Sequence, residues 1–188
     1  MKKLVFALIL TAITGVFGAS NAVAQMKSSN PMVGGAAMYK NKNIVENAVN
    51  SKDHTTLVAA VKAAGLVDTL SGKGPFTVFA PVNSAFDALP AGTVDTLLKP
   101  ENKATLTKVL TYHVVAGNFD SKAIAKAIKK GNGKATFKTV SGGTLTASMN
   151  GSSLVLTDEK GGTARVTIAD VKQSNGVIHV IDTVLMPN

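Results

Sequence analysis

The chain has 188 residues, of which 45% are hydrophobic, with no cysteine and a formal net charge of +9. Without cysteines there is no disulfide framework, so stability must come from the burial of apolar side chains. The first 25 residues, MKKLVFALILTAITGVFGASNAVAQ, combine two lysines, an apolar run and the small residues Ala22 and Ala24. This pattern predicts a signal peptide over residues 1–24, cleaved before Gln25, and a secreted or periplasmic protein.

About 164 residues remain after cleavage, which is enough for one domain with a full core. Loss of Lys2 and Lys3 leaves 18 of the 20 basic residues against 11 acids, a net charge near +7. In an exported protein this charge favours anionic lipid or acidic polysaccharide as partner and disfavours nucleic acid. Residues 25–42 are small and polar without a period, and they predict a flexible N-terminal arm before a domain spanning residues 43–188.

The first half of that domain reads mainly as helices. Apolar residues recur at helical spacing in residues 43–51 and 53–70, and the second of these helices is expected to stop near Gly65. Residues 74–81, GPFTVFAP, change to a strand period between two prolines. Short helical segments follow at 83–89 and 93–98, and longer helices are predicted over 101–115 and 120–131, the latter capped by Asp120 or Ser121.

The second half reads as strands, over residues 134–140, 144–149, 152–158, 164–171 and 176–186. Asn150-Gly151 between the second and third strands predicts a tight hairpin. Helices followed by strands, with one early strand, indicate an α+β fold rather than alternating βαβ units.

Three stretches resemble the signature motifs of the fasciclin domain family. They are GPFTVFAPVNSAF (residues 74–86), YHVV (112–115) and NGVIHVIDTVLMP (175–187), in the family's order and spacing. The resemblance implies a β-sandwich wedge with helices packed along one side, and a role in adhesion or extracellular contact without enzyme activity. The physical reading agrees, because the early apolar strand must pair with distant C-terminal strands and so holds the fold together.

The last motif places His179 three residues before Asp182, a pair that could suggest a catalytic dyad or a metal site. Alternate residues of a strand share a face, so these two side chains point to opposite sides. Apolar neighbours on both faces instead indicate a central strand, in which a hydrogen bond holds a neutral imidazole.

Other chemistry has little support in the sequence. The three histidines are isolated, without the spacing of a metal site. No G-x-S-x-G elbow is present, and the two Gly-Lys segments lack the ending of a phosphate loop. No enzyme activity, metal or cofactor is therefore expected.

The resemblance also suggests where a partner could bind. In animal fasciclin domains a Tyr-His stretch flanked by aliphatic residues is implicated in integrin binding, and Tyr112-His113 matches it. A second associated signal is an Asp-Ile pair, for which this chain has Asp170-Val171. The alternative is structural, since a Tyr-His pair at a helix end beside two valines is commonly buried.

Lysines form the strongest feature that does not depend on the family. One side of the helix predicted at 120–131, opposite its isoleucines, carries four lysines: Lys122, Lys126, Lys129 and Lys130. Two more, Lys134 and Lys138, follow on the next predicted strand. They are either a solvated face or a docking surface for acidic glycan or an anionic membrane.

Together these features predict an exported, non-enzymatic adhesion or envelope-interaction module. Its partner would be a cell-surface or matrix protein or an acidic glycan. The alternative is a carrier of a small apolar ligand, held in a groove between the sheet and the helices. The sequence leaves the oligomeric state open.

Overall fold

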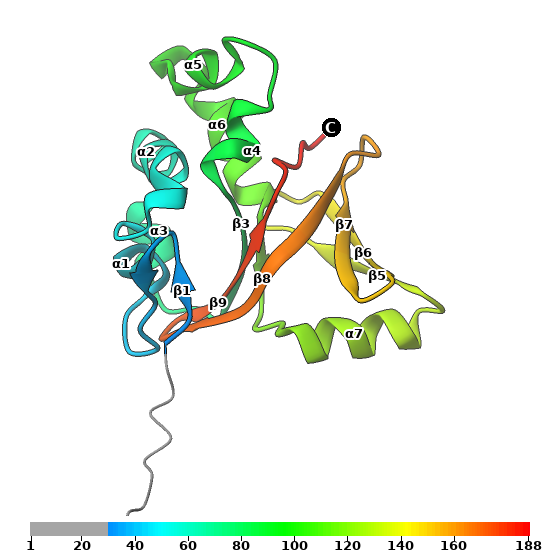
Figure 1. The fold of residues 1–188 in the computed structure, drawn as a ribbon. Helices are drawn as coiled ribbons and strands as arrows, with labels where there is room; N and C mark the ends of the chain where they lie inside the picture. The colour runs from blue at the N-terminus through cyan, green and yellow to red at the C-terminus, as the bar shows by residue number, and fades with distance from the viewer. Residues whose placement is uncertain (1–29) are drawn as a thin grey trace, which may run out of the picture.

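The computed structural model describes residues 30–188, so the predicted signal peptide lies outside the described residues. Six helices gather on one side of a seven-stranded sheet, and the seventh lies against the other end of the sheet (Figure 1). The helices are α1 Ile44–Ala48, α2 Thr55–Ala64, α3 Val67–Ser71, α4 Asn83–Asp87, α5 Thr93–Leu98, α6 Lys103–Tyr112 and α7 Ser121–Lys130. Single 3-10 turns, Lys52–His54 and Pro100–Asn102, precede α2 and α6.

The large sheet has the strand order β4-β3-β9-β8-β7-β6-β5. These strands are β3 Phe76–Pro81, β4 Val114–Ala116, β5 Lys134–Lys138, β6 Thr144–Asn150, β7 Ser153–Thr157, β8 Thr163–Gln173 and β9 Gly176–Ile181. The early strand β3 pairs in parallel with β9, about a hundred residues later, and every other pairing in this sheet is antiparallel. The expected meeting of the early strand with a C-terminal strand is therefore confirmed.

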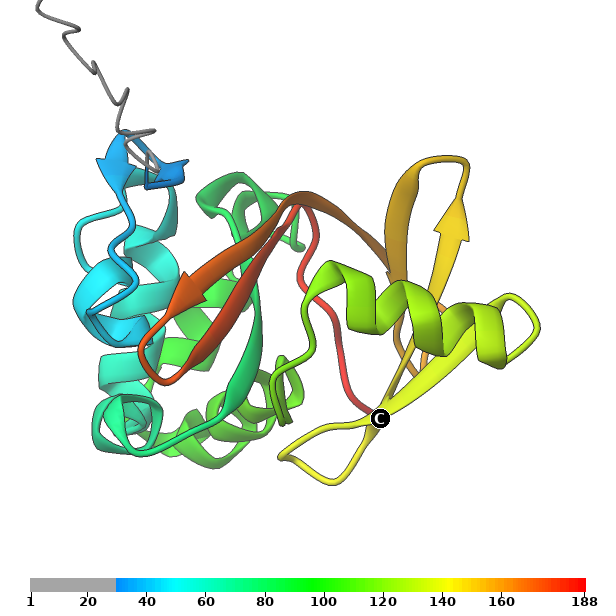
Figure 2. The ribbon, with the colours of Figure 1, turned by 90° about the horizontal axis from the view of Figure 1, so that it is seen from below.

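The long strand β8 makes the sheet fold over on itself. One end of β8 pairs with β7 and the other with β9, and the register shifts twice between Val166 and Val171. Such bulges bend a strand and increase its twist. Figure 2 shows β8 crossing from the helical side of the molecule to the β5–β7 side. An isolated bridge between Val115 and Thr139 brings the two ends of the sheet close to closure.

Two apolar clusters fill the faces of the central strands. Alternation along β3 sends Val78 and Ala80 into a core shared with α1, α2, α3 and α6. The side chain of Phe79 joins the other core, which β6, β7 and α7 complete. All six residues of β9 are buried, as expected for a central strand covered on both faces. The α+β class, with a helical N-terminal half, is confirmed.

The start of β9 is tied to the helices by one side chain. The Nδ2 group of Asn175 donates to the carbonyl oxygens of Leu70, at 2.8 Å, and Gly72, at 2.9 Å, while its Oδ1 accepts from the N–H of Ile44 at 3.0 Å. Gly176 follows, and a Cβ at that position would overlap the carbonyl oxygen of Phe76. The Asn-Gly pair of the C-terminal motif is therefore architectural.

The flexible arm predicted for residues 25–42 is wrong for its described part. Strands β1 Met32–Val33 and β2 Ala36–Ala37 form a small hairpin. The side chains of Val33 and Met38 are buried in the helical core, and the carbonyl of Gly34 accepts a hydrogen bond from Lys52 at 3.1 Å. The largely polar composition of this segment predicted an arm without contacts to the domain, whereas its apolar side chains Val33 and Met38 are buried in the core.

Several boundaries differ from the prediction; the last strand, for example, ends at Ile181 and not at Met186. Helix α6 ends at Tyr112, and Val114 and Val115 form β4 instead of a last helical turn. These β-branched residues cover the free edge of β3, which would otherwise have no partner there. The predicted hairpin between β6 and β7 forms, but its two loop residues are Gly151 and Ser152, because Asn150 pairs with Ser153.

Candidate functional site

His179 and Asp182 do not form a common site. His179 has no exposed surface, its Nε2 lies 2.8 Å from the carbonyl oxygen of Phe119, and its ring stacks on Phe79 with centroids 5.6 Å apart. Burial lowers the pKa of His179, which keeps the imidazole neutral at pH 7. Asp182 lies beyond the end of β9 and accepts a hydrogen bond from the backbone N–H of Arg165 at 2.8 Å. The predicted separation is confirmed.

Tyr112 lies in the interior at the end of α6. Its side chain has no exposed surface, and its hydroxyl donates to the carbonyl of Thr144 at 2.6 Å and accepts from the N–H of Glu159 at 3.1 Å. Burial raises the pKa of Tyr112 to about 12. The hydroxyl therefore connects the helix end to β6 and to the turn before β8.

His113 is equally enclosed. Its Nδ1 lies 2.8 Å from the carbonyl oxygen of Val109, and its Nε2 accepts from the N–H of Leu185 at 3.0 Å. Burial lowers the pKa of His113 to about 4. Because both ring nitrogens are bonded and the side chain is only 2% exposed, His113 cannot contact a partner while the domain keeps this conformation. The same holds for Tyr112, so the structural reading of this pair applies.

Asp170 and Val171 lie at the irregular part of β8. Asp170 has a positive φ of 61°, and its carboxylate accepts hydrogen bonds from both the backbone N–H and the hydroxyl of Ser121, the first residue of α7. Val171 is 1% exposed and belongs to the helical core. The pair therefore attaches α7 to the sheet and offers little surface to a partner.

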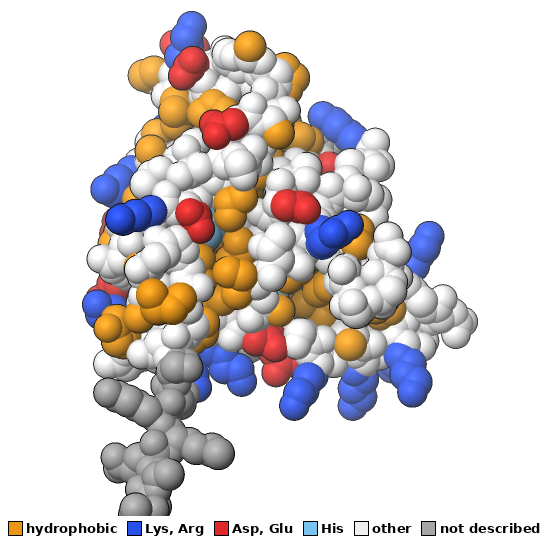
Figure 3. All heavy atoms as spheres, in the orientation of Figure 1, with side chains coloured by type: hydrophobic (Ala, Val, Ile, Leu, Met, Phe, Trp, Pro, Cys, Tyr) orange, Lys and Arg blue, Asp and Glu red, His pale blue; other side chains and the backbone are white. Residues whose placement is uncertain are grey.

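Helix α7 carries the exposed lysines that the sequence predicts. Asp120 caps its start by accepting from the N–H of Ala123 at 2.8 Å. Ile124 and Ile128 are buried against the sheet, which turns Lys122, Lys126, Lys129 and Lys130 outward. Figure 3 shows lysine and arginine side chains in a row along the lower edge of the molecule, where α7 runs in Figure 1. We call these four residues the α7 lysine face.

Lys134 and Lys138 do not extend that face. Ala135 and Phe137 of β5 pack into the core beneath α7, so the alternate residues Lys134 and Lys138 project from the opposite side of the strand. Both are exposed. The six lysines therefore occupy two different faces, because the strand reverses the direction of its side chains while the sequence shows only their proximity.

None of the six lysines is neutralised within residues 30–188. The ion pair found in that range joins Lys99 to Glu101, with Nζ and Oε1 4.0 Å apart. No group of three or more histidine, aspartate or glutamate side chains in the described part of the chain is arranged to hold a metal ion. The positive charge of these six lysines is thus not offset by an ion pair in the described part of the chain.

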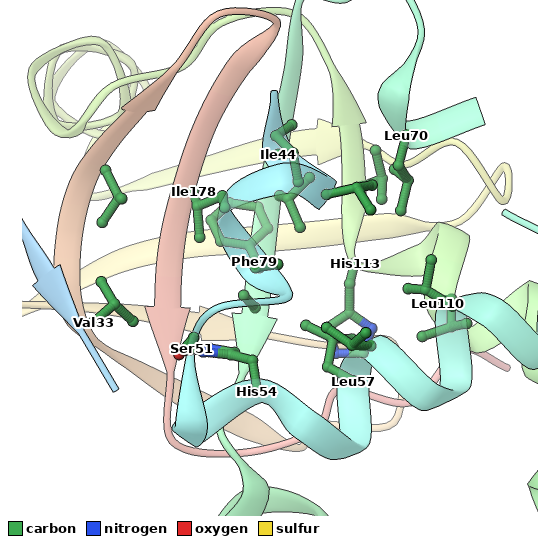
Figure 4. Close-up of a pocket in the computed structure, with 18 of the residues that line it drawn as sticks. Val33, Ile44, Ser51, His54, Leu57, Leu70, Phe79, Leu110, His113 and Ile178 are labelled. Atoms are coloured by element: carbon green, nitrogen blue, oxygen red, sulfur yellow. Dashed lines mark hydrogen bonds between the residues drawn. The ribbon is translucent and has the colours of Figure 1, made fainter. Parts of the chain in front are cut away.

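A cavity lies between the sheet and the helices α1, α2, α3 and α6. Its volume is about 60 Å³, and its walls are largely aliphatic, with Val33, Ile44, Leu57, Leu110 and Ile178 among them (Figure 4). The side chains of Ser51 and His54 lie next to one another at its margin (Figure 4).

Sequence reasoning missed His54 as a site residue. The spacing of the histidines excludes a metal site, and nothing in the pattern marks His54 as buried, since it precedes α2 in a polar segment. The one available signal is the serine three residues before it, whose hydroxyl lies 2.9 Å from His54 Nδ1.

The fasciclin domain model matches residues 52–187, which is most of the described chain. The chain belongs to the fasciclin family. Protein sll1483 of Synechocystis sp. is 45% identical over 195 residues, covering 100% of this chain and 99% of that protein. Cell surface glycolipoprotein MPB83 of Mycobacterium bovis is 35% identical over 170 residues, covering 87% of this chain and 70% of that protein.

A solved structure supports the fold of this fasciclin chain. The FAS1 domain pair of the insect cell adhesion molecule Fasciclin I aligns with a TM-score of 0.55 and 24% identity, over 69% of this chain and 43% of that chain. At this identity the likeness concerns the fold alone. Within residues 30–188, no helix is both long and apolar enough to span a membrane.

Proposed function

We propose that this fasciclin protein is an exported, non-enzymatic interaction module that attaches to acidic polysaccharide of the cell envelope or matrix through the α7 lysine face. The observation that carries the proposal is the absence of any ion pair to these lysines within the described residues. The names of two similar proteins agree with such a setting, one a cell surface glycolipoprotein and the other a cell adhesion molecule.

The burial of the α7 isoleucines favours a polysaccharide over a membrane. Helices that lie in a bilayer interface insert their apolar side chains into it. In α7, however, Ile124 is fully buried and Ile128 is 4% exposed, both within the core. The outward side offers charge without an apolar anchor, which suits a flexible polyanion.

The affinity of one α7 lysine face for the polysaccharide would be low. A lysine close to an anionic surface contributes about 1 kcal/mol, so four give about 4 kcal/mol, which corresponds to a dissociation constant of about 1 mM. Useful attachment would then require several copies on one surface, since linked weak contacts multiply their effect. A binding assay should therefore present the polysaccharide on beads at high density.

The test compares two double variants on alginate beads across a salt series. Lys126→Glu with Lys130→Glu reverses two charges of the α7 lysine face, whereas Lys134→Glu with Lys138→Glu makes the same change in net charge on the opposite side of β5. We expect the first to weaken binding about tenfold or more and to flatten its salt dependence. The second should change binding much less.

Two results would remove the proposal. Equal weakening by the two double variants would mean that net charge alone attracts the protein to the beads. Strong binding of the wild type to anionic vesicles but not to alginate would assign the face to a membrane.

The cavity favours a second function, the carriage of a small apolar ligand. Its aliphatic lining lies where the sheet meets the helices, which is the place that the sequence suggests for a ligand groove. Binding of an apolar molecule there would not involve the α7 lysine face, so one domain could perform both functions.

A further inference from the structure

The wall of the cavity includes His54, one ring nitrogen of which has no hydrogen-bond partner in the domain. Within residues 30–188, His54 Nε2 is the single buried side-chain nitrogen or oxygen that makes no hydrogen bond. The His54 side chain is only 3% exposed. An unbonded buried polar group costs about 1–3 kcal/mol, so natural folds rarely retain one.

Two of the other polar side chains around the cavity, His113 and Ser51, are already bonded, and the third, Lys62, is exposed to solvent. His113 has partners at both ring nitrogens, and the hydroxyl of Ser51 lies 2.9 Å from His54 Nδ1. The backbone of Ala80 is near enough to His54 to act against the lowering of its pKa by burial, yet no hydrogen bond of normal geometry joins it to Nε2. His54 Nε2 is therefore the free polar group of an otherwise apolar space.

The bond to Ser51 determines the chemistry of that free nitrogen. The Ser51 hydroxyl has no hydrogen-bond partner besides His54, so its hydrogen is satisfied only if it is donated to Nδ1. An imidazole whose Nδ1 accepts is the tautomer that carries its proton on Nε2, because burial keeps the ring neutral. His54 Nε2–H is then a donor in need of an acceptor.

The size of the cavity limits what can supply that acceptor. A single water requires about 10–15 Å³ of such volume, so a cavity of about 60 Å³ holds a fragment of only a few non-hydrogen atoms. A water molecule has little to bond with apart from His54, because apolar side chains form most of the wall. An apolar fragment with one acceptor oxygen satisfies both the wall and the donor.

We propose that the cavity binds the end of an apolar molecule that carries a single carbonyl oxygen, a ketone, aldehyde or ester, which accepts a hydrogen bond from His54 Nε2–H. The proposal rests on the second function above and is independent of the α7 lysine face. It names His54 as the specificity-determining residue and Ser51 as the residue that positions its proton.

The test uses two probes of equal shape, 2-butanone and 2-methyl-1-butene, which differ in having C=O or C=CH₂. Each is titrated into the protein at pH 7 while the methyl signals of cavity residues are followed by NMR. We expect the ratio of ketone to alkene affinity to be about threefold to tenfold higher in the wild type than in His54→Leu, because only the wild type offers the ketone a hydrogen bond. We also expect the carbonyl stretching frequency of bound ketone to fall relative to ketone in an alkane solvent.

Variants separate the hydrogen bond from the cavity itself. His54→Leu should lower the ratio of ketone to alkene affinity, and because the two probes have nearly the same shape, a change in cavity volume affects both alike. Ala48→Leu, which fills part of the cavity wall, should weaken both probes while His54 is retained. If His54→Leu fails to fold, the frequency shift in the wild type still decides the question.

Different results would refute the hydrogen bond from His54 and the binding of a ligand in the cavity. The same ratio of ketone to alkene affinity in His54→Leu as in the wild type, or an unshifted carbonyl frequency, would refute the role of His54 and leave an apolar carrier in place. Failure of either probe to perturb the cavity methyl signals would refute the ligand site altogether. Neither result bears on attachment to polysaccharide.

Discussion

The enclosed position of His113 predicts a loss of stability in mild acid. Burial lowers its pKa to about 4, from 6.5 in the unfolded chain. Because the folded state has the lower pKa, the neutral ring contributes its full stabilisation above pH 6.5, and this contribution is lost as the pH falls from 6.5 towards 4. The difference corresponds to about 3 kcal/mol, a large part of the 5–15 kcal/mol typical of a domain. Burial lowers the pKa of His54 and of His179 as well, in the same direction.

Urea unfolding at pH 7.5, 6.5, 5.5 and 4.5 measures this loss, and an NMR titration of the ring protons assigns it to individual histidines. The series ends at pH 4.5 because carboxylates such as Asp170 and Glu159 have lowered pKa values and lose most of their own contributions to stability at more acidic pH. His113→Gln is the matched variant, since its amide can bond the same two backbone groups without titrating. We expect this variant to be less stable at pH 7.5 but to lose less stability by pH 4.5. A folded protein in which His113 titrates near 6.5, or a wild type and variant with parallel pH profiles, would refute the reasoning.

The remaining predictions concern the ties between the sheet and the helices. Asn175→Ala removes a side chain that bonds three backbone groups and should lower the free energy of unfolding by about 2–4 kcal/mol in urea titrations; a change below 0.5 kcal/mol would show that water replaces these bonds. Asp170→Ala loses both bonds to Ser121 and should lower the melting temperature by several degrees, because a loss of about 1–2 kcal/mol has that effect in a domain of this size. Asp170→Asn, which retains an acceptor and tolerates positive φ, should lower it less.

Much of the fold could be predicted because its patterns are local. The period of α7 and its aspartate cap are visible in a dozen residues, and the alternation of β3 and β9 shows which side chains share a face. That alternation also predicted the separation of His179 from Asp182, although in the structure Asp182 lies just beyond the end of β9. Local rules of this kind require no knowledge of which strands are neighbours.

The wrong predictions depend on partners that are distant in sequence. Val114 and Val115 form a strand because the edge of β3 lies beside them, and the described part of the N-terminal arm is ordered because Val33 and Met38 reach the helical core. Lys134 projects away from the α7 lysine face because Phe137 faces the core. The cavity, in turn, forms where four helices meet the sheet, and no single stretch of sequence contains that arrangement.

The hydrogen bonds made by the polar side chains of the family motifs indicate which residues are free to bind a partner. Tyr112, His113, His179 and Asn175 each use their polar atoms on backbone groups of the same domain. Residues whose polar atoms are all hydrogen-bonded inside the domain identify the fold, and they have no free donor or acceptor for a partner. Polar groups without a partner in the described residues lie outside the motifs, in the α7 lysine face and at the buried Nε2 of His54. Specific partners of this protein should therefore be recognised by residues that the family resemblance does not mark, and substitutions at those positions should change binding with little effect on the free energy of unfolding.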